Sequence, residues 1–201
     1  MKIRKTILTL GLFLMSIGYL TSCKPDQSMP KPRGFFKIDL PEKGVKNTFD
    51  STNFPYTFQY PSYGNIIQDT NLVREENQPY WVNVNIPSLN AIIYLSYKTI
   101  NANTSAASLI EESYKLTDAH KSRADFIESS EFMTPNGLQG MFYTVGGNTA
   151  SRYQFYVTDN QKNFIRGALY FNREPNSDST APAELFLRKD IEELVNSMKF
   201  R

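Results

Sequence analysis

The middle of the chain alternates apolar and polar residues. In 81–86, valine and isoleucine alternate with asparagine, and this period of two is typical of a strand with one buried face. Residues 91–97 are apolar on both faces, which predicts a central strand that is covered on each side. A Pro-Ser-Leu-Asn turn at 87–90 separates the two segments, so together they predict a hairpin.

Four further segments have the composition of strands, and turn residues separate them. Their close spacing predicts an antiparallel meander. The segments are 126–132, 138–145, 151–158 and 163–171. The stretch 54–60 is a weaker candidate, because Pro55 and Pro61 confine a strand to an edge or a loop.

Two segments have the 3.6-residue period of a helix. The first is 105–121, with Thr104 as its expected N-cap. The second is 181–198, with Pro182 in its first turn. The residues expected on one side of the first helix are Leu109, Ile110, Ser113, Leu116, Thr117 and His120. The expected apolar stripe of the second is Leu187, Ile191, Leu194, Val195 and Met198.

The order of these elements is strands, helix, meander and helix. It predicts an α+β fold in which two helices flank an antiparallel β-sheet. This order is similar to that of the PsbP and Mog1 folds, which are α-β-α sandwiches.

The first 22 residues have the organisation of a lipoprotein signal peptide. Basic residues precede an apolar run of 15 residues, which is shorter than the roughly 20 that a hydrocarbon core requires. The sequence Leu20-Thr21-Ser22-Cys23 resembles a bacterial lipobox. In proteins of that class the cysteine sulfur takes a diacylglycerol, the chain is cut before it, and the new amine is acylated, palmitate being an expected chain. An ordinary signal peptide or an uncleaved anchor is the alternative.

The rest of the chain divides into a tether and one domain. Residues 23–33 comprise Cys23 and a segment with three prolines, which is expected to be extended and to span roughly 30 Å. Residues 34–201 have the length of a single domain. The predicted organisation is therefore a signal peptide at 1–22, a lipidated tether at 23–33 and an α+β domain at 34–201.

Charge and cysteine content exclude several classes of function. Removal of the leader leaves 19 basic residues against 20 acidic ones, and a neutral domain without a basic cluster argues against a nucleic-acid partner. Cys23 is the sole cysteine, so its lipidation excludes disulfides, thiolate metal sites and a cysteine nucleophile. We expect no cofactor besides the covalent lipid, and no metal.

Residues capable of acid–base chemistry do not form a recognisable catalytic set. His120 is the sole histidine, and its local sequence specifies no partner for it. Acidic pairs occur at 75–76, 111–112 and 192–193, but neighbouring residues on a helix diverge by about 100°. The chain is therefore not expected to be an enzyme. A glycoside hydrolase with a carboxylate pair that the sequence does not reveal remains the alternative.

Aromatic residues are the candidate contact residues. The chain has 14 phenylalanines, 12 tyrosines and one tryptophan, and most of these rings are expected in the sheet core. Exposed rings would bind a protein partner or stack on a glycan. The candidates are Phe35, Phe36, Tyr60, Tyr63, Tyr80 and Trp81.

A short segment identifies a family that the chain resembles. Residues 30–41 read PKPRGFFKIDLP and follow Cys23 closely, and they resemble the start of the gliding-motility lipoprotein D family (GldD). This resemblance implies an envelope lipoprotein of the Bacteroidetes, needed for gliding and linked to type IX secretion. It implies a non-enzymatic accessory or assembly factor whose partners are other gliding and secretion proteins. A peptidoglycan- or glycan-binding module, possibly a hydrolase, is the alternative function.

The residues after Cys23 bear on which membrane holds the lipid. Lys24 is not the aspartate that retains many enterobacterial lipoproteins at the inner membrane, and the lone Asp26 is not the acidic cluster that surface export requires. We therefore expect the periplasmic face of the outer membrane in preference to the inner membrane.

Substitution of Cys23 tests the anchor. Cys23→Ser is expected to move the protein from the membrane to the soluble fraction, because more than one acyl chain is needed for firm attachment and the variant receives none. Immunoblotting of fractionated cells measures this, and a variant retained on the membrane would contradict the prediction.

Overall fold

The computed structural model describes residues 37–201, apart from the side chain of Leu72. The predicted signal peptide, Cys23, the tether, Phe35 and Phe36 lie outside the described residues. No helix within 37–201 combines the length and the apolar composition that crossing a bilayer requires.

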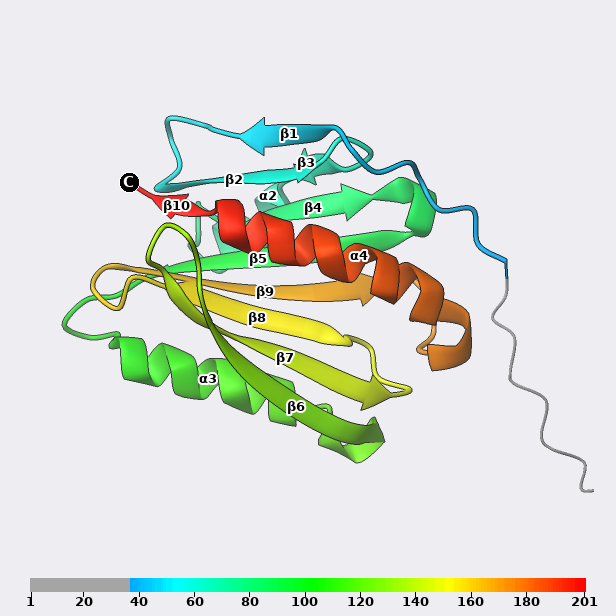
Figure 1. The fold of residues 1–201 in the computed structure, drawn as a ribbon. Helices are drawn as coiled ribbons and strands as arrows, with labels where there is room; N and C mark the ends of the chain where they lie inside the picture. The colour runs from blue at the N-terminus through cyan, green and yellow to red at the C-terminus, as the bar shows by residue number, and fades with distance from the viewer. Residues whose placement is uncertain (1–36) are drawn as a thin grey trace, which may run out of the picture. The chain divides into compact units, whose positions relative to one another are not determined.

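A seven-stranded sheet forms the centre of the domain (Figure 1). Every pair of neighbouring strands is antiparallel, as the sequence predicts. In spatial order the strands are β3 (Asn65–Ile67), β4 (Val82–Ile86), β5 (Ala91–Thr99), β9 (Asn163–Phe171), β8 (Tyr153–Thr158), β7 (Gln139–Gly147) and β6 (Ala124–Met133). The predicted hairpin corresponds to β4 and β5, and the predicted meander corresponds to β6 through β9.

Helices cover the two faces of this sheet (Figure 1). The helix α3 (Ala106–Asp118) lies on one face and α4 (Ser177–Ser197) lies on the other. The predicted α+β class with two flanking helices is therefore confirmed. A short helix that the sequence did not predict, α2 (Thr70–Glu75), precedes β4. Single 3₁₀ turns, η2 (Pro87–Leu89) and η3 (Lys121–Arg123), connect longer elements.

The strand β8 is buried on both faces, and all six of its residues are buried. Its odd-numbered side chains join the larger core, which includes the α4 residues Leu187, Ile191 and Leu194. Its even-numbered side chains face α3, where Tyr156 packs with Leu109. The alternation of side chains along a strand therefore supplies both cores from one segment.

The segment predicted at an edge or in a loop lies in the middle of a second, three-stranded sheet. This sheet has the order β1 (Lys46–Phe49), β2 (Tyr56–Pro61) and β10 (Lys199–Phe200). The prediction was wrong because Pro55 precedes β2 and Pro61 ends it, so neither proline interrupts its pairing. Tyr56 and Phe58 are buried in the larger core.

The central position predicted for 91–97 is confirmed, since β5 pairs with both β4 and β9. Its predicted burial on both faces is wrong. Tyr94 is 38% exposed, because α3 covers the sheet farther along, over β8 and β9.

The first helix begins one residue later than predicted and buries a narrower stripe. The hydroxyl oxygen of Ser105, and not that of Thr104, accepts the capping hydrogen bond from the Ser108 N–H at 3.1 Å. Leu109, Ser113 and Thr117 are its buried residues, whereas Leu116 is 45% exposed. His120 lies beyond the end of the helix.

The second helix starts earlier than predicted. Asn176 caps α4 through a hydrogen bond from the Ser179 N–H at 3.3 Å, so Pro182 lies in the second turn and not the first. The predicted apolar stripe is confirmed, and all five of its residues are buried.

Polar contacts on two sides of α4 involve Lys43 and Glu184. Lys43, in the segment before β1, donates from Nζ to the Phe186 carbonyl at 2.7 Å and to Asp190 Oδ1 at 3.1 Å. On the other side of the helix, buried Glu184 accepts a hydrogen bond from the Thr180 hydroxyl at 2.7 Å and lies 3.6 Å from Arg152 Nε. Burial raises the pKa of Glu184.

A pair of substitutions on α4 tests which face supports the domain. Leu187→Ala is expected to lower the free energy of unfolding by about 3 kcal/mol, because Leu187 is fully buried and its truncation leaves a cavity. Leu185→Ala is the control; it is expected to cost less than about 0.5 kcal/mol, since Leu185 is 56% exposed. Equal costs in urea unfolding would contradict the described position of α4.

Candidate functional site

Tyr60 and Tyr63, two of the predicted contact residues, are half-buried and packed within the domain. The Tyr60 ring lies 6.2 Å from that of Phe58. The Tyr63 ring lies 5.8 Å from that of Phe186, and its hydroxyl donates a hydrogen bond to Asp190. Burial, together with this hydrogen bond, raises the pKa of Tyr63. Tyr63 therefore helps to fix α4 against the small sheet.

Tyr80 and Trp81 lie next to each other along the chain but have different surroundings. The Tyr80 ring packs edge to face on Tyr97 at 5.6 Å, and its carbonyl accepts a hydrogen bond from the Tyr56 hydroxyl at 2.6 Å. Trp81 donates from Nε1 to the Tyr97 carbonyl at 2.9 Å, and its ring lines a cavity on the α3 face. The four predicted contact residues within 37–201, which are Tyr60, Tyr63, Tyr80 and Trp81, therefore do not form one exposed surface.

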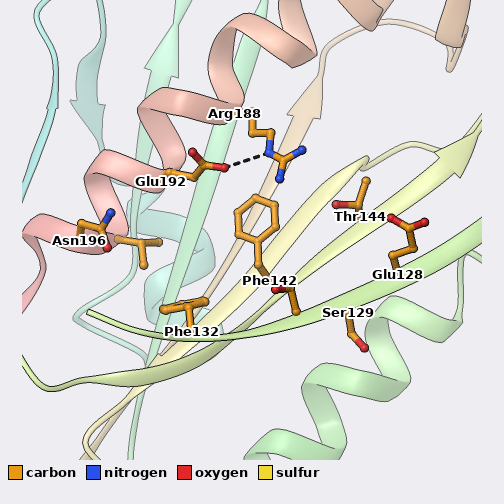
Figure 2. Close-up of a pocket in the computed structure, with 10 residues that line it drawn as sticks. Glu128, Ser129, Phe132, Phe142, Thr144, Arg188, Glu192 and Asn196 are labelled. Carbon is orange, nitrogen blue, oxygen red and sulfur yellow. Dashed lines mark hydrogen bonds and ion pairs between the residues drawn. The ribbon is translucent and has the colours of Figure 1, made fainter. Parts of the chain in front are cut away.

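A groove between α4 and the edge strand β6 has a volume of about 540 Å³ (Figure 2). The sequence did not single out this groove, which we call the α4–β6 groove. Phe132 and Phe142 lie on its floor, and Arg188 and Glu192 project from α4 over them (Figure 2). Its lining residues are Glu128, Ser129, Ser130, Phe132, Phe142, Thr144, Arg188, Glu192, Val195 and Asn196.

The register of β6 and β7 decides which side chains enter the groove. Glu128 pairs with Thr144 and Ser130 with Phe142, so these four side chains share the face of the sheet on which α4 lies. Phe132 pairs with Gly140, and the missing side chain there makes room for its ring. The groove therefore has a mixed floor of rings and hydroxyl groups.

The charges of the groove are only partly paired. Arg188 Nε donates to Glu192 Oε1 at 2.9 Å, and this hydrogen bond raises the pKa of Arg188. The Arg188 guanidinium also lies 5.8 Å from the centre of the Phe142 ring, within the range of a cation–π interaction. Glu128 lies on the opposite wall and is exposed, so it is available to a cation from outside the domain.

The backbone of β6 adds a second feature to the groove. Over its ten residues β6 pairs only with β7 among the described strands, so its outer edge presents unpaired N–H and C=O groups. Its charged residues are all acidic, namely Asp125, Glu128 and Glu131. Such an edge accepts an extended peptide by β-augmentation, and the alternate side chains of that peptide would enter the groove.

The residues considered for catalysis do not converge. Burial, and then the charge of Arg166, lower the pKa of His120 at the end of α3. Glu111 pairs with Lys115 and Glu112 with Lys98, each at 2.7 Å, so the acidic pair on α3 diverges as predicted. Within 37–201, no three side chains of types that bind metals are grouped closely enough to hold an ion.

The chain has similarity to a known protein family and to a known structure. The family described as gliding motility lipoprotein GldD matches residues 25–200. No curated protein matches the chain. Among solved structures, the chain is similar to the solution structure of cyanobacterial PsbP (CyanoP) from Synechocystis sp. PCC 6803, with 12% sequence identity and a TM-score of 0.50. The match covers 81% of this chain and 98% of that one, and it confirms the predicted PsbP-like fold, and the fold alone.

Two glycines of β7 provide a test of the groove floor. A Cβ at Gly140 would collide with the Tyr156 carbonyl oxygen, which is fixed in the sheet, as well as with the Phe132 ring. Gly140→Ala is therefore expected to destabilise the domain by about 2 kcal/mol or more.

Gly146→Ala is the matched control, since the nearest atoms to a Cβ there belong to the side-chain ring of Phe126, which is 43% exposed and has solvent beside it, and not to the backbone of the sheet. We expect its cost to stay below about 1 kcal/mol. Urea unfolding measures both changes. If Gly146→Ala proves as costly as Gly140→Ala, the described packing of β6 on β7 is incorrect.

Proposed function

This chain belongs to the gliding motility lipoprotein GldD family, and from that premise we propose that it is a non-enzymatic accessory or assembly factor for gliding and for the linked type IX secretion machinery. A lipid on Cys23 would hold the domain at the periplasmic face of the outer membrane. The tether at 23–33 would set its distance from the lipid surface.

The observation that carries this proposal is the α4–β6 groove beside the unpaired edge of β6. A partner segment that adds a strand to β6 gains main-chain hydrogen bonds, and the rings of Phe132 and Phe142 offer apolar contact area to its side chains. The main-chain hydrogen bonds to β6 would provide the affinity for the partner. The partner side chains that enter the groove would provide the specificity.

Charge defines the partner further. The segment 124–133 carries three acidic residues and no basic one, and Glu192 on the facing wall is already paired with Arg188. An approaching acidic segment would be repelled, whereas a basic one would pair with Glu128 and Glu131. We therefore propose that the partner is an extended basic segment of another envelope protein of the motility and secretion machinery.

A second candidate function is peptidoglycan or glycan binding, with possible hydrolysis. The observation in its favour is that Glu128 and Glu192 line the groove from opposite sides, above a floor that contains two rings. Two carboxylates that flank a sugar are the minimum set for a glycoside hydrolase. Release of muropeptides from purified sacculi by wild type, and its loss in Glu128→Gln, would favour this candidate over the first.

Charge reversal on β6 tests the docking proposal. We expect Glu128→Lys with Glu131→Lys to abolish or strongly reduce gliding, while the melting temperature changes little because Glu128 and Glu131 are exposed. Glu111→Lys, the reversal of an exposed glutamate on α3, is the control and should leave gliding intact. Normal gliding in the double variant would contradict the proposal.

A photo-crosslinking residue in place of Ser130 identifies the partner in the same cells. Ser130 lines the groove, whereas Tyr114 on the outer side of α3 is a control position of similar access. We expect a crosslink to a motility or secretion protein from position 130 and not from position 114. Crosslinks of equal yield from both positions would mean that the groove is not the docking surface.

A further inference from the structure

A second cavity lies on the opposite face of the sheet, beneath α3 and the segment that follows α2. It has a volume of about 280 Å³, and the sequence did not single it out as a site. Strand β9 contributes Arg166 to its wall, α3 contributes Ser113, and the chain before β4 contributes Trp81. We call it the Arg166 cavity.

Arg166 carries a charge that nothing in the described part of the chain neutralises directly. Its guanidinium donates a hydrogen bond to Gln154 Oε1, but its Nε has no hydrogen-bond partner, and no carboxylate of residues 37–201 lies within ion-pair distance. The nearby Glu112 is paired with Lys98 at 2.7 Å. Burial lowers the pKa of Arg166. Arg166 is half-buried, and its Nε is shielded from solvent, so an anion that pairs with it would remove an unfavourable unpaired charge.

Two further polar groups beside Arg166 also lack partners. Gln154 is fully buried; its Oε1 accepts a hydrogen bond from the guanidinium, and its Nε2 has no hydrogen-bond partner within the described chain. The Ser113 hydroxyl is buried in the cavity wall and has no hydrogen-bond partner within the described chain. Arg166 and Ser113 both line the cavity, and their unpartnered groups offer an N–H and an O–H donor to one bound anion.

The rest of the cavity wall indicates what such an anion carries. Trp81 is held in place by its hydrogen bond to the Tyr97 carbonyl, and it lines the cavity together with Phe164 and Leu109. These side chains suit an apolar or planar body. Glu112 in this wall is paired with Lys98, whereas Glu76, which also lines the cavity, would repel an anion with more than one negative charge.

We propose that the Arg166 cavity binds a small organic monocarboxylate. Its carboxylate would accept hydrogen bonds from Arg166 and Ser113, and its apolar body would pack on Trp81 and Phe164. This site lies on the face of the sheet opposite to the α4–β6 groove. The proposal is therefore independent of the docking proposal, and either can fail without the other.

Trp81 is the sole tryptophan of the chain, so a change in tryptophan fluorescence reports on the surroundings of this one side chain in the cavity wall. The experiment uses the full lipoprotein, purified in detergent and titrated with benzoate, with its neutral analogue benzamide and with inorganic phosphate. Benzoate is expected to change the fluorescence saturably, with a Kd on the order of 1 mM. Benzamide and phosphate are expected to bind at least about 10-fold more weakly.

Variants assign this binding to the cavity. Arg166→Gln is expected to weaken benzoate binding at least about 10-fold, and Ser113→Ala to weaken it about 3-fold. Arg173→Gln, an exposed site beyond the end of β9, is the control and should bind as wild type does. Benzoate should also raise the melting temperature of wild type, and not that of Arg166→Gln.

Three results would overturn the proposal. Equal binding of benzoate and benzamide would mean that only the apolar wall binds, and tighter binding of phosphate would exclude the monocarboxylate class. If the fluorescence of the wild-type protein changes with benzoate but does not saturate, benzoate does not bind at a defined site. Water alone would then hydrogen-bond to Arg166. All three results are measured on the wild-type protein, so they test the proposed monocarboxylate site even if Arg166→Gln fails to fold.

Discussion

The domain depends on the burial of β8 on both of its faces. The six residues of this strand alternate between two cores, one shared with α4 and the other with α3. A shift of one residue in its register would exchange the two sets, placing Gln154 in the apolar core and Phe155 beside Arg166. The register of one strand thus determines both the packing of the helices and the polar wall of the Arg166 cavity.

Periodic segments were predictable from the sequence, and short ones were not. The alternation in β4 and the stripe of α4 are local patterns that span several turns or residue pairs, so they indicate both the element and its buried face. Strands β1, β3 and β10 have four, three and two residues, and they exist only through pairing with distant segments. Two-sided burial was expected for β5 but belongs to β8, because the position of α3 on the sheet is a tertiary property.

The functional surfaces were less predictable than the fold. The sequence singled out Trp81 as an aromatic ring, yet its relation to the cavity depends on three elements far apart in the chain. The sequence did mark Arg166, because it is the sole charged residue in the largely apolar strand β9, and a charge in such a strand requires a partner. The α4–β6 groove had no comparable signal, because its floor depends on the register of β6 with β7.

The contact of Lys43 with α4 has a mechanical consequence. Lys43 lies before β1 and is held by the Phe186 carbonyl, by Asp190 and by the Phe186 ring, 4.1 Å from its Nζ. A force applied to the chain on the N-terminal side of Lys37 therefore acts on the apolar core through Ile38 and on α4 through Lys43. The ion pair would yield first under load, while the hydrogen bonds of the central sheet, and the two sites built on it, stay intact.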